Sequence, residues 1–322
     1  MKINSNYTVN NNIGFNSYNK LNPKTNMSTS TSFYHDLITL KKAVGIIEKN
    51  FPKGADILVY AGSNGEEAIS VYSLFKNPEN YTIYSIDPYR DAIEYAKRGI
   101  YSVHRLCDDG FIINDQAHTE DEIQAGKCLS NCLEEIEKPP FKLNNLTDLI
   151  YFLRYDSPAI IWEKFYKLKP AVRNNIKFIE GDIRDINSFK TDKPVGGIFF
   201  RNALYHLTNN NLFGVLEYGD KPDMEIDRCK ILNELITTVD KKLAVNGIFV
   251  MGNHSQEHLY MADNHTPQNE KVPFKNIYLM TTPPHIEAIL KNGHFKKCYE
   301  QEIPMPWSSF SIKMPLIWEK ME

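Results

Sequence analysis

The sequence lacks long apolar runs, is poor in cysteine and carries little net charge. No stretch of its 322 residues approaches the ~18 consecutive apolar residues of a membrane-spanning helix, and the N-terminus has no apolar core of the signal-peptide type. Five unevenly spaced cysteines fit a reducing cytoplasm better than a disulfide framework. A net charge of −3 gives no general attraction to phosphate backbones. We therefore expect a cytoplasmic protein that neither enters a membrane nor binds nucleic acid.

The composition is that of a globular domain behind a polar tail. Hydrophobic residues make up 42% of the chain and charged residues 24%, and the length allows a sizeable core. Residues 1–30 contain nine asparagines and only scattered apolar side chains. We predict a disordered or loosely attached tail over 1–30 and one domain over 31–322.

A turn between a strand and a helix stands at the centre of the pattern. Ile57 to Tyr60 is a short apolar run of the kind that forms a covered parallel strand. Apolar residues then recur on one helical face: Ala68, Val71, Tyr72 and Phe75. Between them, Gly62 and Gly65 remove bulk where a ligand would approach a helix N-terminus. Because small residues also join strands to helices in sheets that bind nothing, this turn alone is a weak signal.

A second β-type run ends in an acid. Residues 81–86 are followed by Asp87, about 20 residues after Gly65. In βαβ nucleotide-binding units an acid at this distance accepts hydrogen bonds from ribose hydroxyls. Asp87 could also cap a helix that runs from Pro88 to Arg98 and is stopped by Gly99, and the two roles are compatible.

The rest of the chain continues the alternation of strands and helices. We predict strands at 176–179, 195–200 and 248–252, helices at 229–243 and 284–292, and a closing antiparallel pair at 296–303 and 316–320. This alternation predicts an α/β fold with a mostly parallel sheet and helices on both faces.

A first helix is expected before these strands, and an insertion within them. Thr31 or Ser32 would cap the helix, and its apolar stripe would be Leu37, Leu40, Val44 and Ile47. Residues from about 102 to 170 form the insertion, in which 149–166 reads as helix interrupted at Ser157-Pro158. We expect this insertion to cover the ligand crevice and to set selectivity.

Several motifs occur along the chain in a fixed order. They are Thr31-Ser32-Phe33-Tyr34-His35-Asp36, Ala61-Gly62-Ser63-Asn64-Gly65-Glu66-Glu67, Ala96-Lys97-Arg98-Gly99-Ile100-Tyr101, Phe200-Arg201-Asn202-Ala203-Leu204 and Gly252-Asn253-His254-Ser255. In this order they resemble the CheR-type chemotaxis-receptor glutamate methyltransferases, which have a similar turn ending Ser-x-Gly-Glu-Glu and a similar Arg-Asn-Val-Leu. The resemblance runs from about Thr31 to about Gln256.

The resemblance implies a Rossmann-like class I methyltransferase with a seven-stranded sheet, using S-adenosylmethionine as cofactor, and by family analogy an O-methyltransferase. Gly62 and Gly65 would lie at the amino-acid end of the cofactor, Asp87 at the ribose, and Asp182 with Ile183 at the adenine. The other cofactor-site residues implied are Thr31, Ala61, Ser63, Glu66, Glu67, Arg201 and Asn202.

The methyl acceptor decides which side chains catalyse. A carboxylate acceptor is ionised near neutral pH and needs only a hydrogen-bonding clamp, for which Arg201, Asn202, Tyr205 and His206 are the candidates. Each of these residues could instead have a purely structural role: Arg201 could form a salt bridge, and Tyr205 could pack against its neighbours.

Three positions depart from the family pattern. His35 stands where the family has arginine, and Ala61 stands where methyltransferases commonly have glycine. The family also has a tyrosine at the position of His206, whereas here the tyrosine, Tyr205, comes one residue earlier. We therefore keep open a methyltransferase of small molecules or other proteins that uses His35 or His206 as a base. A degenerate fold kept as an interaction module is a further alternative. The expected partner is a methyl acceptor, either a protein carboxylate or a small molecule.

Metal binding is not expected. Four residues have spacings that could suit zinc, namely His104, Cys107, Cys128 and Cys132, but they lack the tight ligand pairs of structural sites, and the two last cysteines share a predicted helix face. His254, His258 and His265 are interpreted as surface or loop residues.

Overall fold

A computed structural model describes the greater part of the chain. The described residues are 33–103, 106–107, 110–111, 119–137, 164–201, 203–207, 222–252, 284–304 and 311–322. They form a seven-stranded sheet with the order β11-β12-β10-β9-β1-β2-β8. Its strands are β1 (Asp56–Tyr60), β2 (Thr82–Asp87), β8 (Ile176–Glu180), β9 (Val195–Phe200), β10 (Ile248–Met251), β11 (Phe295–Pro304) and β12 (Ser311–Lys320).

Strand directions identify the type of sheet. The strands β8, β2, β1, β9 and β10 run parallel, whereas β12 is antiparallel to both β10 and β11. The chain order reverses direction between β1 and β9, as at the switch point of a doubly wound fold. This is the Rossmann-like fold of class I methyltransferases. The fold predicted from the sequence is confirmed, including its closing antiparallel pair.

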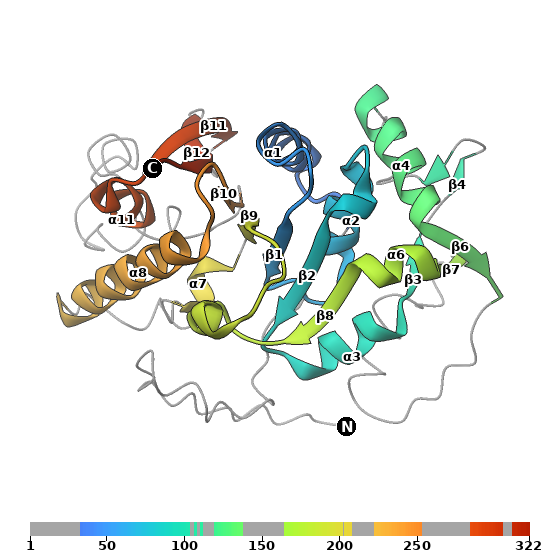
Figure 1. Cartoon of the computed structure of the whole chain (residues 1–322), viewed down its shortest axis with the longest axis horizontal. Coiled ribbons are helices and arrows are strands. Elements are labelled where there is room, and N and C mark those ends of the chain that lie inside the picture. The colour runs from blue at the N-terminus through green and yellow to red at the C-terminus, as the bar shows by residue number, and fades with distance from the viewer. Residues whose placement is uncertain are drawn as a thin grey trace, which may run out of the picture.

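Helices cover both faces of the sheet (Figure 1). The longer ones are α1 (Leu37–Asn50), α2 (Glu66–Leu74), α3 (Arg90–Arg98), α8 (Pro222–Lys242) and α11 (Pro284–Asn292). Shorter ones are α6 (Pro170–Asn175), α7 (Leu204–Leu207) and the 3-10 turns η2 (Pro78–Asn80) and η3 (Ile183–Ser188). The helices predicted at 284–292 and 229–243 are confirmed, the latter with an earlier start at Pro222, a residue suited to a first helical position.

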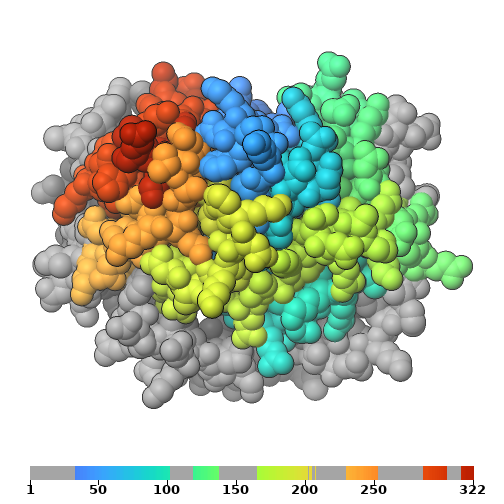
Figure 2. Space-filling model, in the orientation of Figure 1, coloured from blue at the N-terminus to red at the C-terminus, as the bar shows by residue number. Residues whose placement is uncertain are grey.

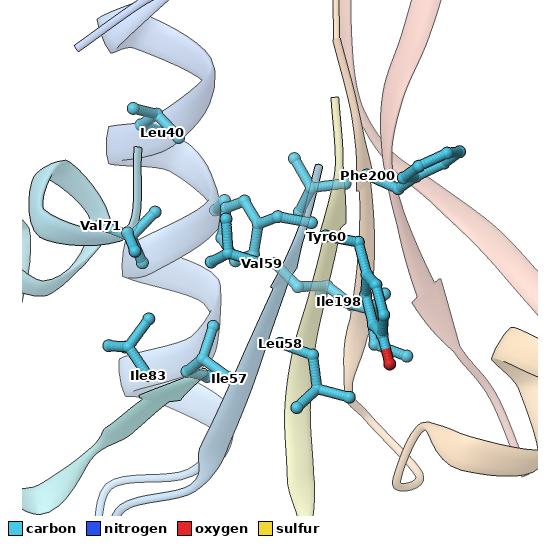
Figure 3. Close-up of a cluster of buried hydrophobic side chains, with 14 of the residues drawn as sticks. Leu40, Ile57, Leu58, Val59, Tyr60, Val71, Ile83, Ile198 and Phe200 are labelled. Atoms are coloured by element: carbon cyan, nitrogen blue, oxygen red, sulfur yellow. The ribbon is translucent and has the colours of Figure 1, made fainter. Parts of the chain in front are cut away.

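The core is built around β1, in which all residues are buried. Side chains alternate along a strand, so Ile57 and Val59 face the side of α1 and α2, and Leu58 and Tyr60 face the opposite side (Figure 3). Each such fully buried aliphatic side chain contributes about 1.5–3 kcal/mol of hydrophobic stabilisation. The space-filling view shows α1 and α2 side by side between the β11–β12 hairpin and α4 (Glu120–Cys132) (Figure 2).

The predicted cap of α1 is wrong, although the apolar stripe of that helix is buried as expected. Asp36 is the N-cap, and its side chain accepts the Thr39 N–H at 3.4 Å. Thr31 and Ser32 lie outside the described residues, as does the 1–30 tail. The helix starts late because Tyr34 is anchored in a turn, with its N–H donated to Ser70 Oγ of α2 at 2.9 Å.

The described part of the insertion forms a small subdomain. The strands β3 (Ile100–Val103), β7 (Lys164–Leu168) and β6 (Leu133–Ile136) make an antiparallel sheet, and β4 (Leu106–Cys107) pairs with β5 (Gly110–Phe111). The helix predicted over 149–166 is wrong at its end, because Phe165 and Tyr166 pair in β7 with both neighbouring strands. Residues 149–163 lie outside the described residues.

The helices were also compared with the requirements of a membrane span. In the part of the chain that the structure describes, none is both long and apolar enough to cross a bilayer.

Gly65 generates a stability prediction with an internal control. It has φ +91°, and a Cβ there would stand 2.5 Å from Phe178 Cε1. We expect Gly65→Ala to lower the free energy of unfolding by about 1–3 kcal/mol. Gly45→Ala, in α1 with nothing within 4 Å of the added atom, should instead raise it by about 0.5–1 kcal/mol. Urea denaturation of both variants checks this, and equal effects would contradict it.

Candidate active site at the carboxyl edge of the sheet

The carboxyl ends of the parallel strands meet at one edge of the sheet, where open α/β folds bind ligands. Ala61 follows β1, Gly181 follows β8 and Arg201 follows β9, while Asp87 ends β2. Several residues singled out from the sequence therefore lie at this edge.

The turn after β1 is tight and strained. Ala61 and Ser63 adopt φ values of 54° and 47°, which cost non-glycine residues about 1–2 kcal/mol each. The turn is fixed by backbone hydrogen bonds, from the Gly62 N–H to the Ile86 carbonyl at 3.2 Å and from the Gly65 N–H to the Gly62 carbonyl at 2.8 Å. Such strain persists only where the surroundings impose it, and it gathers at functional sites.

The two glycines of this turn are required by the protein's own packing. A Cβ on Gly62 would lie 2.5 Å from Ser85 Oγ, and one on Gly65 would meet Phe178 and, at 3.2 Å, the Tyr101 hydroxyl. That hydroxyl also donates to the Asn64 carbonyl at 3.0 Å. Close packing thus explains both glycines without reference to a ligand.

Asp87 links this turn to the segment after β2. Its two carboxylate oxygens accept the N–H of Ser63 at 2.9 Å and the N–H of Tyr89 at 2.8 Å. Burial raises the pKa of Asp87, the two backbone hydrogen bonds oppose this, and nearby Asp182 adds to it. Each oxygen keeps a second lone pair for another donor. Asp87 is not the helix cap that we considered, because α3 begins at Arg90 with Tyr89 as its N-cap.

Asp182 is the N-cap residue of η3, the turn after β8. Its Oδ1 accepts the Arg184 N–H at 3.0 Å and Arg184 Nε at 2.6 Å, and its Oδ2 pairs with Arg184 Nη2. The neighbouring Ile183 is buried. The sequence suggested an acidic residue in water here, or an acceptor for an amine, but it did not reveal the partner Arg184.

Arg201 is completely buried and surrounded by partners from two other segments. Its guanidinium donates to Glu67 Oε2 at 3.1 Å and to the His35 carbonyl at 2.5 Å, and lies 3.8 Å from Asp36 Oδ2. The salt-bridged alternative is therefore what the structure shows. Three predicted site residues, His35, Glu67 and Arg201, are brought together here, and Asp36 joins them without having been anticipated.

This cluster carries more acid than base. Burial raises the pKa of Glu67, Arg201 opposes the rise, and Asp36 adds to it. Within the described residues, Glu67 Oε1 and Asp36 Oδ2 are buried acceptors that receive no hydrogen bond, and Arg201 Nε is a buried donor that makes none. Two carboxylates around one guanidinium leave a site that suits an additional positive group or hydrogen-bond donor.

The remaining candidates are only partly visible. Tyr205 and His206 lie in α7, and nothing further is described of their side chains. Asn202 and Thr31 lie outside the described residues. Glu66 and Ser63 are buried at the start of α2 and in the turn before it.

Of the four residues with spacings that could suit zinc, the structure describes the side chains of Cys128 and Cys132. Cys128 and Cys132 lie on α4, where burial raises the pKa of Cys132 to about 12. No group of three or more His, Cys, Asp or Glu side chains with metal-binding placement occurs among the described residues. His104, His254, His258 and His265 lie outside them.

Comparisons with known proteins give structural likeness without a family. No protein-family model and no curated protein matches this chain. The carbon methyltransferase DszA covers 90% of this chain, which spans 55% of DszA, at 11% identity and a TM-score of 0.41. A SAM-dependent methyltransferase from Methanosarcina mazei covers 86%, with 97% of its own length matched, at 12% identity and a TM-score of 0.38.

A third likeness is to the plantazolicin methyltransferase BpumL in complex with SAH. The match covers 90% of this chain and 85% of the BpumL chain, at 10% identity and a TM-score of 0.37. TM-scores and identities this low carry no activity over to the present chain. The strand order of the chain itself defines its fold.

The buried cluster predicts how stability responds to Arg201→Met. Removing one partner of a buried ion pair costs about 3–5 kcal/mol, because Glu67 would be left uncompensated. A carboxyl whose folded pKa is raised loses its stabilising contribution as pH rises through that pKa. We therefore expect a larger loss at pH 7.5 than at pH 5, measured by urea denaturation.

A double variant separates the charge effect from lost packing. Glu67→Gln combined with Arg201→Met should recover part of the stability lost at pH 7.5, because the uncompensated carboxylate is gone. A strictly additive double variant with no pH dependence would refute the electrostatic account.

Proposed function

We propose that this protein is an S-adenosylmethionine-dependent methyltransferase. The observation that carries the proposal is the position of Asp87, buried at the carboxyl end of β2 and bonded to the turn after β1, in a sheet of class I methyltransferase order. An acid at this point is suited to the ribose hydroxyls of an adenosine ligand.

The residues at this edge suit the charges of the cofactor. Its amino-acid end would lie by the turn after β1 and the start of α2, where Glu67 and Asp36 offer buried acceptors to an ammonium group. Asp87 keeps lone pairs for the ribose, and Asp182 with Ile183 would meet the adenine. When bound, the cofactor supplies a methyl group on a sulfonium. The protein's own contribution is to align an acceptor with that methyl group and to exclude water.

The burial of Arg201 bears on the choice of methyl acceptor. To bind a glutamate carboxylate of the acceptor, a guanidinium must not already be neutralised by carboxylates of the protein. Arg201 is buried, pairs with Glu67 and lies near Asp36. This favours a hydroxyl or amine acceptor over the receptor-type glutamate of the CheR-like enzymes, with His35 or His206 as base. His35 belongs to the turn before α1, and its backbone carbonyl accepts a hydrogen bond from Arg201.

Calorimetry with S-adenosylhomocysteine tests the cofactor. We expect micromolar binding by the wild type and its loss in Asp87→Ala, because the ribose hydroxyls would lose their buried acceptor. Asp91→Ala, an exposed acid in the first turn of α3, is the matched control and should bind normally. Affinity should also fall as pH drops through the raised pKa of Asp87. Absence of binding by the wild type would reject the cofactor and leave an interaction module.

The nature of the methylated product tests the acceptor. We expect the wild type to methylate a glutamate-bearing helical receptor peptide poorly, and His35→Arg, which restores a cationic fork, to do so better. With methyl-labelled cofactor and a host lysate, the label should resist mild base, as methylated amines and ethers do. Efficient, base-labile labelling of the peptide by the wild type, unaffected by His35→Ala, would instead establish carboxylate methylation.

A further inference from the structure

Arg184 folds back onto the carboxylate of Asp182 two residues earlier. Its Nε lies 2.6 Å from Oδ1, its Nη2 pairs with Oδ2, and its backbone N–H donates to Oδ1 at 3.0 Å. The side chains are largely sheltered, with 6% of Arg184 and 17% of Asp182 exposed. A planar guanidinium that engages both oxygens fixes the plane of the carboxylate, which a single donor would not do.

The pair of Arg184 and Asp182 lies beside the adenosine site of the proposed function, and the inference rests on that function. Asp87 is the register partner of Glu180, and the Gly181 N–H donates to the Asp87 carbonyl at 3.1 Å. Asp182 therefore follows β8 directly beside Asp87, on the side away from β1. A nucleoside whose ribose contacts Asp87 and whose amino-acid end lies by β1 extends its base toward Asp182.

The acceptor capacity of Asp182 is nearly filled by Arg184. Of about four lone-pair positions on a carboxylate, Oδ1 uses two and Oδ2 uses one. One position on Oδ2 remains, in an orientation set by the guanidinium. Asp182 lies near enough to Asp87 that repulsion between the two carboxylates adds to the raised pKa of Asp87.

We propose that Arg184 is a positioning residue for nucleobase specificity. By fixing the Asp182 carboxylate in one plane, it leaves a single acceptor for the exocyclic amine of adenine. A nucleobase with a carbonyl oxygen at that position would place one hydrogen-bond acceptor against another, the free Asp182 oxygen. The site therefore rejects such a base.

Calorimetry with two ligands tests this directly. S-adenosylhomocysteine is compared with S-inosylhomocysteine, in which a carbonyl replaces the adenine amine. We expect the wild type to prefer the adenosyl ligand by about 10- to 100-fold, the range of one hydrogen bond to a charged group. Arg184→Gln should reduce this ratio about tenfold, mainly through weaker binding of the adenosyl ligand. Arg184→Lys, which keeps the charge but not the fork, should be intermediate.

Controls make each outcome decisive. Asp185→Asn, which removes an exposed carboxylate from the same turn, should leave the ratio unchanged. If Arg184→Gln unfolds, Arg184→Lys decides. An unchanged ratio in the folded variant shows that Arg184 only stabilises the capping carboxylate of η3, and it overturns the inference. If the wild type binds S-adenosylhomocysteine but lacks the preference, the inference alone fails. If it binds neither ligand, the proposed function fails with it.

Discussion

The buried guanidinium of Arg201 joins three segments that are far apart in the sequence. It contacts the turn before α1 through His35 and Asp36, the first turn of α2 through Glu67, and is itself the residue after β9. Because the side chain has no exposed surface, water cannot replace any of these partners. Together with the hydrogen bond from Tyr34 to Ser70, this cation therefore fixes the N-terminal turn, α2 and the sheet edge relative to one another.

The same cluster shapes the electrostatics of the edge. Burial raises the pKa of both Glu67 and Asp87, so the folded protein bears a cost for keeping carboxylates there. Strain is added by positive φ angles at Tyr34, Asp36, Ala61 and Ser63, which lie in the two segments beside the cluster. Costs of this kind concentrate where a ligand offsets them, and a cofactor with ammonium and sulfonium groups would do so.

Local patterns predicted most of the fold and the outline of the site. The strands, the main helices and the position of Asp87 followed from apolar periodicity and from spacing after Gly65, because these depend on neighbours within one or two turns of chain. The start of α1 was misjudged, since the choice of Asp36 as cap depends on Tyr34 docking against α2. The strand β7 was misjudged because its partners lie far away in the sequence.

The sequence by itself determined that this protein is an α/β domain with a glycine turn and an acid poised at one sheet edge. Only the tertiary structure decided what the charged residues there do. A guanidinium that follows a strand can bind a substrate, or it can form ion pairs with carboxylates of the protein itself. Which of the two it does depends on the carboxylates that folding brings near it. For Arg201 these are Asp36 and Glu67, which the sequence separates by more than a hundred residues from their partner and which folding places within 4 Å.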